Sequence, residues 1–449
     1  MATNRSLFRW ILNSIADRGL SFREGLGQSP IRALSQELVS ERGEASGTAI
    51  ARELATRYAA LSNAERLKFF EGLLQPVWLA DPEEIFRLAK DYHSKRGAAE
   101  LTRLVRVSEP KRQELFRRIN MGPHGTETVV NMRRDLLALL PDHPQLEPIN
   151  SDMVHLLASW FNRGFLELRR IDWRTPANVL EKLIRYEAVH KIEGWPDLRR
   201  RLQRDRRCFA FFHPALPEEP LIFVQVALTR TIPGAIQPLL NIDAPEMDPK
   251  KADTAAFYSI SNCLDGLRNI SFGAFLLKQV IHELETDQLD LSNFVTLSPI
   301  PGFRTWLRKQ GLDGSEELNP AGMNKTQRFK LTQMCARYLT AQSSSGRAAD
   351  PVTHFHLSNG AAIERINWMG DTSRKGMQQS YGLMVNYSYR PPRIERNHEQ
   401  YVKQGRLALS KEVAELLEEP KPAPKSSKSQ PVSQVREIEA RSQGAPTAP

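Results

Sequence analysis

Three segments in the second half of the chain decide the fold: Phe257-Tyr-Ser-Ile-Ser-Asn262, Arg268-Asn-Ile-Ser-Phe-Gly-Ala274 and Phe275-Leu-Leu-Lys-Gln-Val-Ile-His-Glu-Leu284. The first is rich in aromatic and branched residues and predicts a buried strand. The second carries a glycine among polar residues and predicts a turn. In the third, apolar residues recur every fourth position from Leu276, which predicts a helix packed on a sheet.

This order of strand, turn and helix indicates a candidate phosphate site. Backbone N–H groups and the dipole at a helix start attract anions, Gly273 allows close approach, and Arg268 and Lys278 add positive charge. The candidate binding residues are Arg268, Asn269, Ile270, Ser271, Phe272, Gly273 and Ala274. The alternative is an ordinary helix that begins after a glycine. A P-loop is excluded because the GxxxxGK[ST] spacing is absent.

Short apolar segments on both sides of this unit extend the sheet. Strands are predicted at residues 208–212, 220–228, 254–264, 294–297, 353–357, 361–368 and 382–389. Strands mixed with helices indicate an α/β or α+β domain over residues 191–400.

Residues 1–190 have helical spacing and predict a helical bundle without strands. Asp81-Pro82 shows the start of one helix, with a capping residue and a proline in the first turn, and another helix is predicted over Ser151 to Leu168. The function of this part is predicted to be a scaffold or an oligomerisation module. Residues 419–449 are rich in Pro, Ser and Lys and predict a disordered tail.

The composition of the 449 residues admits several partners. The net charge of +10 is compatible with nucleic acid, anionic lipid or a polyanionic small molecule, and also with an ordinary basic protein. The densest basic run is Arg199 to Arg207. Three widely spaced cysteines argue against a disulfide scaffold and for a reducing compartment, so a cytoplasmic location is expected. The chain has no run of 18 apolar residues, so no transmembrane helix is expected, and the predicted partners do not include a membrane.

Ser298 in Leu297-Ser-Pro-Ile-Pro-Gly-Phe303 is a candidate catalytic residue. Pro299 holds Ser298 in extended geometry, Pro301 fixes the chain again and Gly302 allows a sharp turn. A stiff strand end suits a catalytic hydroxyl, although a structural turn has the same pattern. A hydrolase elbow is not supported because GxSxG is absent.

Thr353-His-Phe-His-Leu357 holds two histidines, which on a strand would point to one face. They could bind a metal, but no third ligand stands at a telling distance. One catalytic histidine beside a surface histidine is the favoured interpretation. Downstream, Tyr387 is predicted to be a core residue, whereas Tyr389 is either a core residue or the partner that orients the histidine.

Together these segments resemble the malonyl-CoA decarboxylase family. The resemblance rests on Phe257-Tyr-Ser-Ile-Ser-Asn, Ile270-Ser-Phe-Gly-Ala-Phe-Leu-Leu-Lys278, Leu297-Ser-Pro-Ile-Pro-Gly-Phe303, Phe355-His-Leu-Ser-Asn-Gly-Ala361, Arg365-Ile-Asn-Trp-Met369 and Gly382-Leu-Met384, in this order. It covers most of the chain up to Tyr389.

The resemblance implies an N-terminal helical oligomerisation domain and a catalytic domain similar to GNAT-type N-acetyltransferases. It implies that Ser298 and His356 are the catalytic pair that converts malonyl-CoA to acetyl-CoA and CO2. Because the thioester can take up the electrons as an enolate, no cofactor or metal is expected, and Tyr389 is predicted to orient His356. His354 does not match the catalytic position. The 268–274 turn would bind coenzyme A and supply N–H groups to the enolate oxygen, although Asn269 replaces a glycine that is common in the family. A homo-oligomer, either a tetramer or a dimer, is expected.

Two other functions are compatible with these features. One is a coenzyme A-dependent acyltransferase on the same fold, which would consume acetyl-CoA. The other is a basic nucleic-acid-binding protein that uses the Arg199–Arg207 run and the tail; the resemblance implies no nucleic-acid partner.

Overall fold

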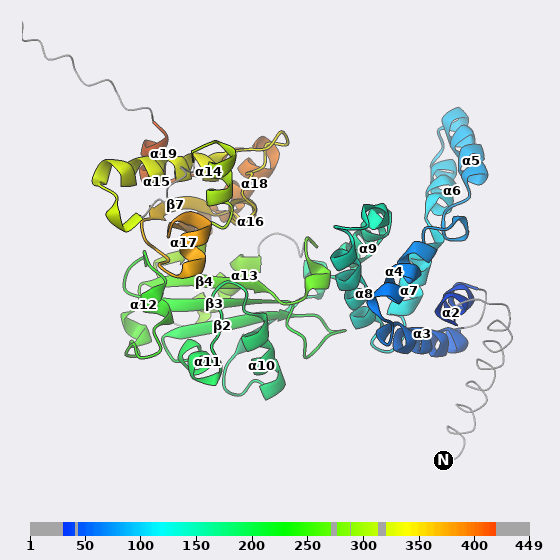
Figure 1. Cartoon of the computed structure of the whole chain (residues 1–449), viewed down its shortest axis with the longest axis horizontal. Coiled ribbons are helices and arrows are strands. Elements are labelled where there is room, and N and C mark those ends of the chain that lie inside the picture. Colours follow the sequence, from blue (N-terminus) through cyan, green and yellow to red (C-terminus); the bar gives the residue numbers. More distant parts are fainter. Residues whose placement is uncertain (1–29, 41–43, 271–275, 288, 313–319, 419–449) are drawn as a thin grey trace, which may run out of the picture.

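The computed structural model describes residues 30–40, 44–270, 276–287, 289–312 and 320–418. The predicted tail 419–449 and the binding residues Ser271, Phe272, Gly273 and Ala274 lie outside these ranges. Figure 1 shows a helical half and a half built on a sheet.

The helical half has a core of interlocked apolar side chains. Its elements are α2 (Pro30–Leu38), α3 (Glu44–Ala59), α4 (Asn63–Gly72), η1 (Pro76–Trp78), α5 (Pro82–Lys95), α6 (Ala98–Ser108), α7 (Lys111–Asn120), α8 (Gly125–Leu139), η2 (Pro144–Leu146), α9 (Glu147–Trp160) and η3 (Arg163–Phe165). The predicted start of α5 is confirmed, because the Asp81 side chain accepts a hydrogen bond from the Glu83 N–H. Leu54, Phe70 and Phe116 are among its fully buried residues.

The second half contains one mixed sheet of eight strands. Its strands are β1 (Glu167–Ile171), β2 (Arg206–Phe212), β3 (Ile222–Thr229), β4 (Thr254–Asn262), β5 (Asn293–Thr296), β6 (Ser298–Pro299), β7 (Ala362–Asn367) and β8 (Met384–Tyr389). The order is β1-β2-β3-β4-β5-β8-β6, and β7 also pairs with β8. β4 and β5 are parallel, whereas the other pairs of named strands in the described residues are antiparallel.

Helices cover both faces of this sheet. They are α10 (Ala177–Tyr186), α11 (Trp195–Arg201), α12 (Gln237–Leu240), α13 (Leu276–Thr286), α14 (Phe303–Lys309), α15 (Lys325–Thr340), α16 (Pro351–Ser358), α17 (Arg374–Ser380), α18 (Ile394–Gln404) and α19 (Lys411–Leu417), with 3-10 turns η4 (Pro249–Lys251), η5 (Asp265–Leu267), η6 (Pro320–Gly322) and η7 (Pro391–Arg393). α13 packs in the same apolar cluster as Phe257 and Tyr389, as its periodicity predicts. α10 and α11 share a separate cluster with Phe212 and Phe223.

The prediction that residues 1–190 hold no strand is wrong, because Glu167–Ile171 forms the edge strand β1. The end of the predicted helix over Ser151 to Leu168 is therefore also wrong, since α9 ends at Trp160. The sequence Glu-Leu-Arg-Arg-Ile is largely polar, and its hydrogen bonds to β2 make it a strand. Such a partner lies too far along the chain for local periodicity to reveal it.

The predicted strand at residues 353–357 is also wrong, because these residues lie in helix α16. Asp350 caps this helix through the Thr353 N–H, and Pro351 occupies its first turn. In a helix, residues two apart point in different directions, so His354 and His356 do not share a face.

Candidate active site

Ser298 lies where two strands meet. It pairs with Val385 of β8, at the start of β6, and only Leu297 separates it from the end of β5. Its side chain is buried, with 7 % of the residue exposed. The predicted stiff strand end therefore positions the hydroxyl inside the domain.

Helix α16 brings His356 to this hydroxyl. The Ser298 Oγ and His356 Nε2 atoms are 3.1 Å apart, although the residues are 58 positions apart in the chain. On the other side of the ring, the Tyr389 hydroxyl lies 2.8 Å from Nδ1. The three predicted catalytic residues thus form one hydrogen-bonded chain. Enzymes in which a third group orients the base beside a nucleophile have the same arrangement.

The structure adds two residues that the sequence did not indicate as part of the site. The ring of Tyr387, predicted to be a core residue, stacks on His356 with centroids 4.3 Å apart and planes at 25°. The buried hydroxyl of Thr296 accepts a hydrogen bond from the Ser298 hydroxyl at 2.9 Å. Alternation along β8 carries one usable signal, because it places Tyr387 and Tyr389 on the same face.

Burial favours the uncharged forms of His356 and Tyr389. Removal of the ring from water lowers the pKa of His356 to about 3. The same effect raises the pKa of the Tyr389 phenol well above its ordinary value, so the hydroxyl keeps its proton. The Ser298 proton is directed to Thr296. His356 is therefore a neutral ring whose Nε2–H donates to Ser298 and whose Nδ1 accepts from Tyr389.

His354 has a different environment from His356. Its Nδ1 lies 2.7 Å from the Tyr401 hydroxyl, and the ring is partly buried. Across the described residues, no group of three or more His, Cys, Asp or Glu side chains gathers in a way that could hold a metal ion. The two histidines therefore belong to two separate hydrogen-bonded groups.

Of the predicted binding turn, Arg268, Asn269 and Ile270 are described. Asn269 has φ +62°, a left-handed conformation that glycine adopts freely and that asparagine tolerates better than most residues. The replacement of a glycine by Asn269 is therefore compatible with this backbone. The exposed Arg268 guanidinium pairs with Asp265 at 2.9 Å.

The helical half supports the same turn through Arg133 of α8. This arginine is 1 % exposed, and its Nη1 donates to the carbonyls of Gly266 at 2.6 Å and Arg268 at 2.9 Å. A Cβ on Gly266 would lie 2.0 Å from the Val130 carbonyl oxygen. The two halves are therefore in close contact at the candidate binding turn.

Two hollows lie elsewhere on the sheet half. One, of about 500 Å³, is lined by residues that include Glu364, Arg390 and Lys411. The other, of about 710 Å³, is lined by residues that include Arg365 and Asn367. Neither is lined by Ser298, His356 or Tyr389.

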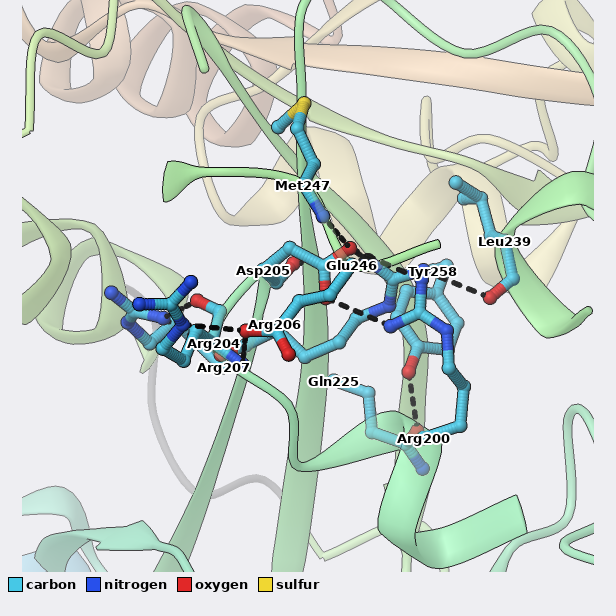
Figure 2. Close-up of polar contacts among 10 residues, drawn as sticks. All are labelled: Arg200, Arg204, Asp205, Arg206, Arg207, Gln225, Leu239, Glu246, Met247 and Tyr258. Carbon is cyan, nitrogen blue, oxygen red and sulfur yellow. Dashed lines mark hydrogen bonds and ion pairs between the residues drawn. The ribbon is translucent and has the colours of Figure 1, made fainter. Parts of the chain in front are cut away.

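The densest basic run of the sequence is mostly internal (Figure 2). Arg200 binds Asp205 through two hydrogen bonds of 2.8 and 3.1 Å, and Arg206 reaches the same carboxylate at 2.9 Å. Arg200, Arg206 and Arg207 are each at most 9 % exposed. These three guanidinium groups are therefore not available to nucleic-acid phosphates, whereas Arg199 and Arg204 of the same run are exposed.

Along the described residues, no helix has both the length and the apolar character needed to cross a membrane.

Two known domain families match this chain. Residues 164–325 and 310–428 match the malonyl-CoA decarboxylase C-terminal domain, and residues 78–161 match the malonyl-CoA decarboxylase N-terminal domain. Together these matches include helices α5 to α9 of the helical half, the sheet and all three predicted catalytic residues.

Individual proteins and structures give the same result. Mitochondrial malonyl-CoA decarboxylase of Mus musculus is 36% identical over 350 residues, which are 69% of this chain and 71% of that protein. The protein of the same name from Anser anser anser is 36% identical, and the match spans 64% of its length. The crystal structure of malonyl-CoA decarboxylase from Rhodopseudomonas palustris has 46% identity and a TM-score of 0.79, covering 86% of this chain and 98% of that one. The structure from Agrobacterium vitis has 44% identity and a TM-score of 0.80, covering 87% and 100%. By sequence and by structure, this chain belongs to the malonyl-CoA decarboxylase family.

Proposed function

We propose that the chain is a malonyl-CoA decarboxylase, a carboxy-lyase that converts malonyl-CoA to acetyl-CoA and CO2. The observation that carries the proposal is the buried chain from Ser298 through His356 to Tyr389, on the family's motifs. Malonyl-CoA is activated for this reaction, because its thioester can accept the electrons as an enolate. The protein must hold the substrate, stabilise the enolate oxygen and supply one proton.

The reaction breaks the bond between the α-carbon and the free carboxyl group. The electron pair of that bond moves into the thioester enolate, and the carboxyl group leaves as CO2. The α-carbon then takes one proton and gives acetyl-CoA. The balance requires one proton for each turnover and no oxidant or reductant.

We assign the proton transfer to His356 acting through Ser298. The free ring is neutral because burial disfavours its charge, but a substrate carboxylate in the same dry site favours the imidazolium form. His356 therefore takes up a proton when malonyl-CoA binds. Ser298 Oγ lies 3.1 Å from His356 Nε2. The imidazolium therefore gives its Nε2 proton to Oγ, and the serine hydroxyl passes a proton to the α-carbon. Tyr389 keeps the ring in the required orientation.

Coenzyme A is proposed to bind at the turn that contains Arg268, Asn269 and Ile270, and to continue toward the catalytic residues between β4 and β5. Two features of β4 support this path. The pairing of β3 with β4 shifts by one residue between Gln225 and Val226, which makes β4 bulge. The ladder between β4 and β5 ends at Phe257 and Thr296, so the two parallel strands are free to diverge after it. The same features favour an acetyltransferase-like fold for the sheet half.

The proposed activity is tested by CO2 release from malonyl-CoA with no acceptor added, followed by detection of acetyl-CoA. His356→Ala and Ser298→Ala should each abolish most of the release while the variants keep the circular dichroism spectrum of the folded protein. Normal release from a folded His356→Ala variant would show that the assignment of the site is wrong. Consumption of acetyl-CoA only when an amine is added would instead indicate an acyltransferase.

Self-association is proposed to involve the helical half. α5 and α6 form a hairpin at one end of the molecule (Figure 1). Phe86 on α5 is 70% exposed and Val105 on α6 is 60% exposed. A second copy that covers these side chains would give a dimer or, through two such surfaces, a tetramer. Light scattering of the intact chain and of Phe86→Ser measures the oligomeric state.

A cytoplasmic location stays a prediction, supported by three free, buried cysteines.

A further inference from the structure

Asp350 is a buried carboxylate beside the catalytic residues, with no role in the mechanism above. It is 0% exposed and caps α16, the eight-residue helix that carries His356. Across the described ranges no cation forms an ion pair with it, and three hydrogen bonds satisfy its oxygens. A buried carboxylate is costly unless its bonds are kept, so the groups that bond to it are held firmly in place.

One oxygen of Asp350 controls the surroundings of His356. Oδ2 accepts from the Thr353 N–H at 2.8 Å and from the Thr353 hydroxyl at 3.0 Å. The Thr353 hydroxyl lies 2.8 Å from the Tyr387 hydroxyl. Because the single Thr353 proton is used on Asp350, Tyr387 must be the donor in that bond. This fixes Tyr387, whose ring stacks on His356.

The other oxygen of Asp350 supports the segment from Ser298 to Phe303, called the Ser298 loop here. Oδ1 accepts from the Tyr338 hydroxyl at 2.8 Å. That hydroxyl fills the space beside Gly302, since a Cβ on Gly302 would lie 2.1 Å from its oxygen. Gly302 precedes α14 and follows Ser298 by four positions. The Tyr338 ring also contacts Phe303, with centroids 5.8 Å apart.

We propose that Asp350 is a positioning residue that holds His356 and the Ser298 loop in one fixed relation. The contact of 3.1 Å between Ser298 and His356 joins β6 to α16, which belong to different parts of the chain. Asp350 reaches one of them through Thr353 and Tyr387 and the other through Tyr338. The proposal rests on the proposed decarboxylase function, because its importance for catalysis depends on the Ser298–His356 contact.

The kinetic test uses variants in the two hydrogen-bonded connections of Asp350, called arms here. The first arm runs through Thr353 and Tyr387, and the second runs through Tyr338. Thr353→Val removes the hydroxyl of the first arm and keeps the size of the side chain, while Thr353→Ser keeps the hydroxyl. Tyr338→Phe removes the second arm. We expect Thr353→Val and Tyr338→Phe each to lower kcat between about 10- and 100-fold, with KM nearly unchanged, because a small displacement of a catalytic group has effects of that size. Thr353→Ser should restore kcat nearly to the wild-type value.

The double variant Thr353→Val/Tyr338→Phe tests whether the two arms act together through Asp350 or act independently of each other. If Asp350 joins the arms, loss of one arm already releases the contact, and the two effects on kcat combine to less than their product. Effects that multiply fully, or a kcat that stays at wild type in folded single variants, would overturn the proposal.

A control variant excludes a general effect of lower stability. Asp81→Ala removes the cap of α5 in the helical half, which costs stability by the same kind of change. Its kcat should stay at the wild-type value. If it falls as far as that of Thr353→Val, the loss reports stability alone and the proposal fails.

A readout independent of turnover is the 15N spectrum of the His356 ring. The wild-type ring should show one neutral form with the proton on Nε2, and Thr353→Val should show a mixture of forms, whereas Thr353→Ser should not. If the wild-type protein releases no CO2 from malonyl-CoA, the proposed function fails, and the spectrum still tests the support of His356. An unchanged spectrum in Thr353→Val would overturn the positioning role even in an active enzyme.

Discussion

Tyr389→Phe is the change for which the structure gives the clearest expectation. It removes one oxygen atom and with it the hydrogen bond of 2.8 Å to His356 Nδ1. Both residues are at most 2% exposed, so water does not replace the lost donor. The phenylalanine ring keeps the contact with Phe257, whose ring centroid lies 6.3 Å away.

The size of the effect follows from the nitrogen that loses its partner. An unsatisfied buried acceptor costs about 1–3 kcal/mol, and a free Nδ1 no longer keeps the ring in the form with the proton on Nε2. If the cost falls on the reacting state, kcat falls by about 5- to 150-fold. KM should change little, because the lost bond lies on the side of the ring away from Ser298.

The assay is release of labelled CO2 from malonyl-CoA at several substrate concentrations, with unfolding in urea measured in parallel. Tyr401→Phe is the matched control, since its hydroxyl makes the same kind of bond, 2.7 Å long, to Nδ1 of His354. We expect Tyr401→Phe to keep the wild-type kcat. A Tyr389→Phe enzyme that unfolds like the wild type and keeps its full kcat would refute the orienting role of Tyr389.

Three further predictions concern stability and substrate binding. The pKa of His356 is about 3 when folded and near 6.5 when unfolded, so only the unfolded chain binds this proton between those values. The free energy of unfolding, measured by urea titration, should therefore fall as the pH decreases below 6.5. In His356→Gln this fall should be shallower by about 1.4 kcal/mol per pH unit. An unchanged slope would contradict burial of a neutral ring. Arg133→Met removes two hydrogen bonds to the 266–268 turn and should raise KM for malonyl-CoA about ten-fold with little change in kcat, whereas an unchanged KM would separate that turn from coenzyme A. Gly360 has φ +84°, and a Cβ there would lie 2.2 Å from the Ile394 carbonyl oxygen, so Gly360→Ala should lower the free energy of unfolding by about 2 kcal/mol or more; wild-type stability would show that the turn can move.

Local patterns were sufficient where one segment carries its own signal. The spacing of apolar residues predicts α13, the cap at Asp81 predicts α5, and the apolar runs predict β2 and β3. The motifs also indicate Ser298, His356 and Tyr389, which the structure brings together. These signals depend on neighbours within a few residues, which the sequence displays directly.

Local patterns failed for β1 and α16. β1 is polar and becomes a strand because β2 offers it hydrogen bonds. In α16 the alternating apolar residues indicated a strand, but the buried cap Asp350 and the following proline make a helix. In β1 a tertiary partner outweighs a weak local preference, whereas α16 begins with the same local signal as α5, a capping aspartate followed by proline, which the alternating residues obscured.

The sequence by itself therefore determined the helical character of the first half, several individual helices and most strands, and it indicated Ser298, His356 and Tyr389 as candidate catalytic residues. Only the tertiary structure decided the state of His356 and the residues that surround it. Its neutral form depends on burial by the whole domain, and its partners Ser298 and Tyr389 come from segments 58 and 33 positions away. The contacts of Tyr387 and Asp350 around His356 were decided in the same way, because hydrogen bonds and ring stacking depend on distance in space, whereas periodicity reports only distance along the chain.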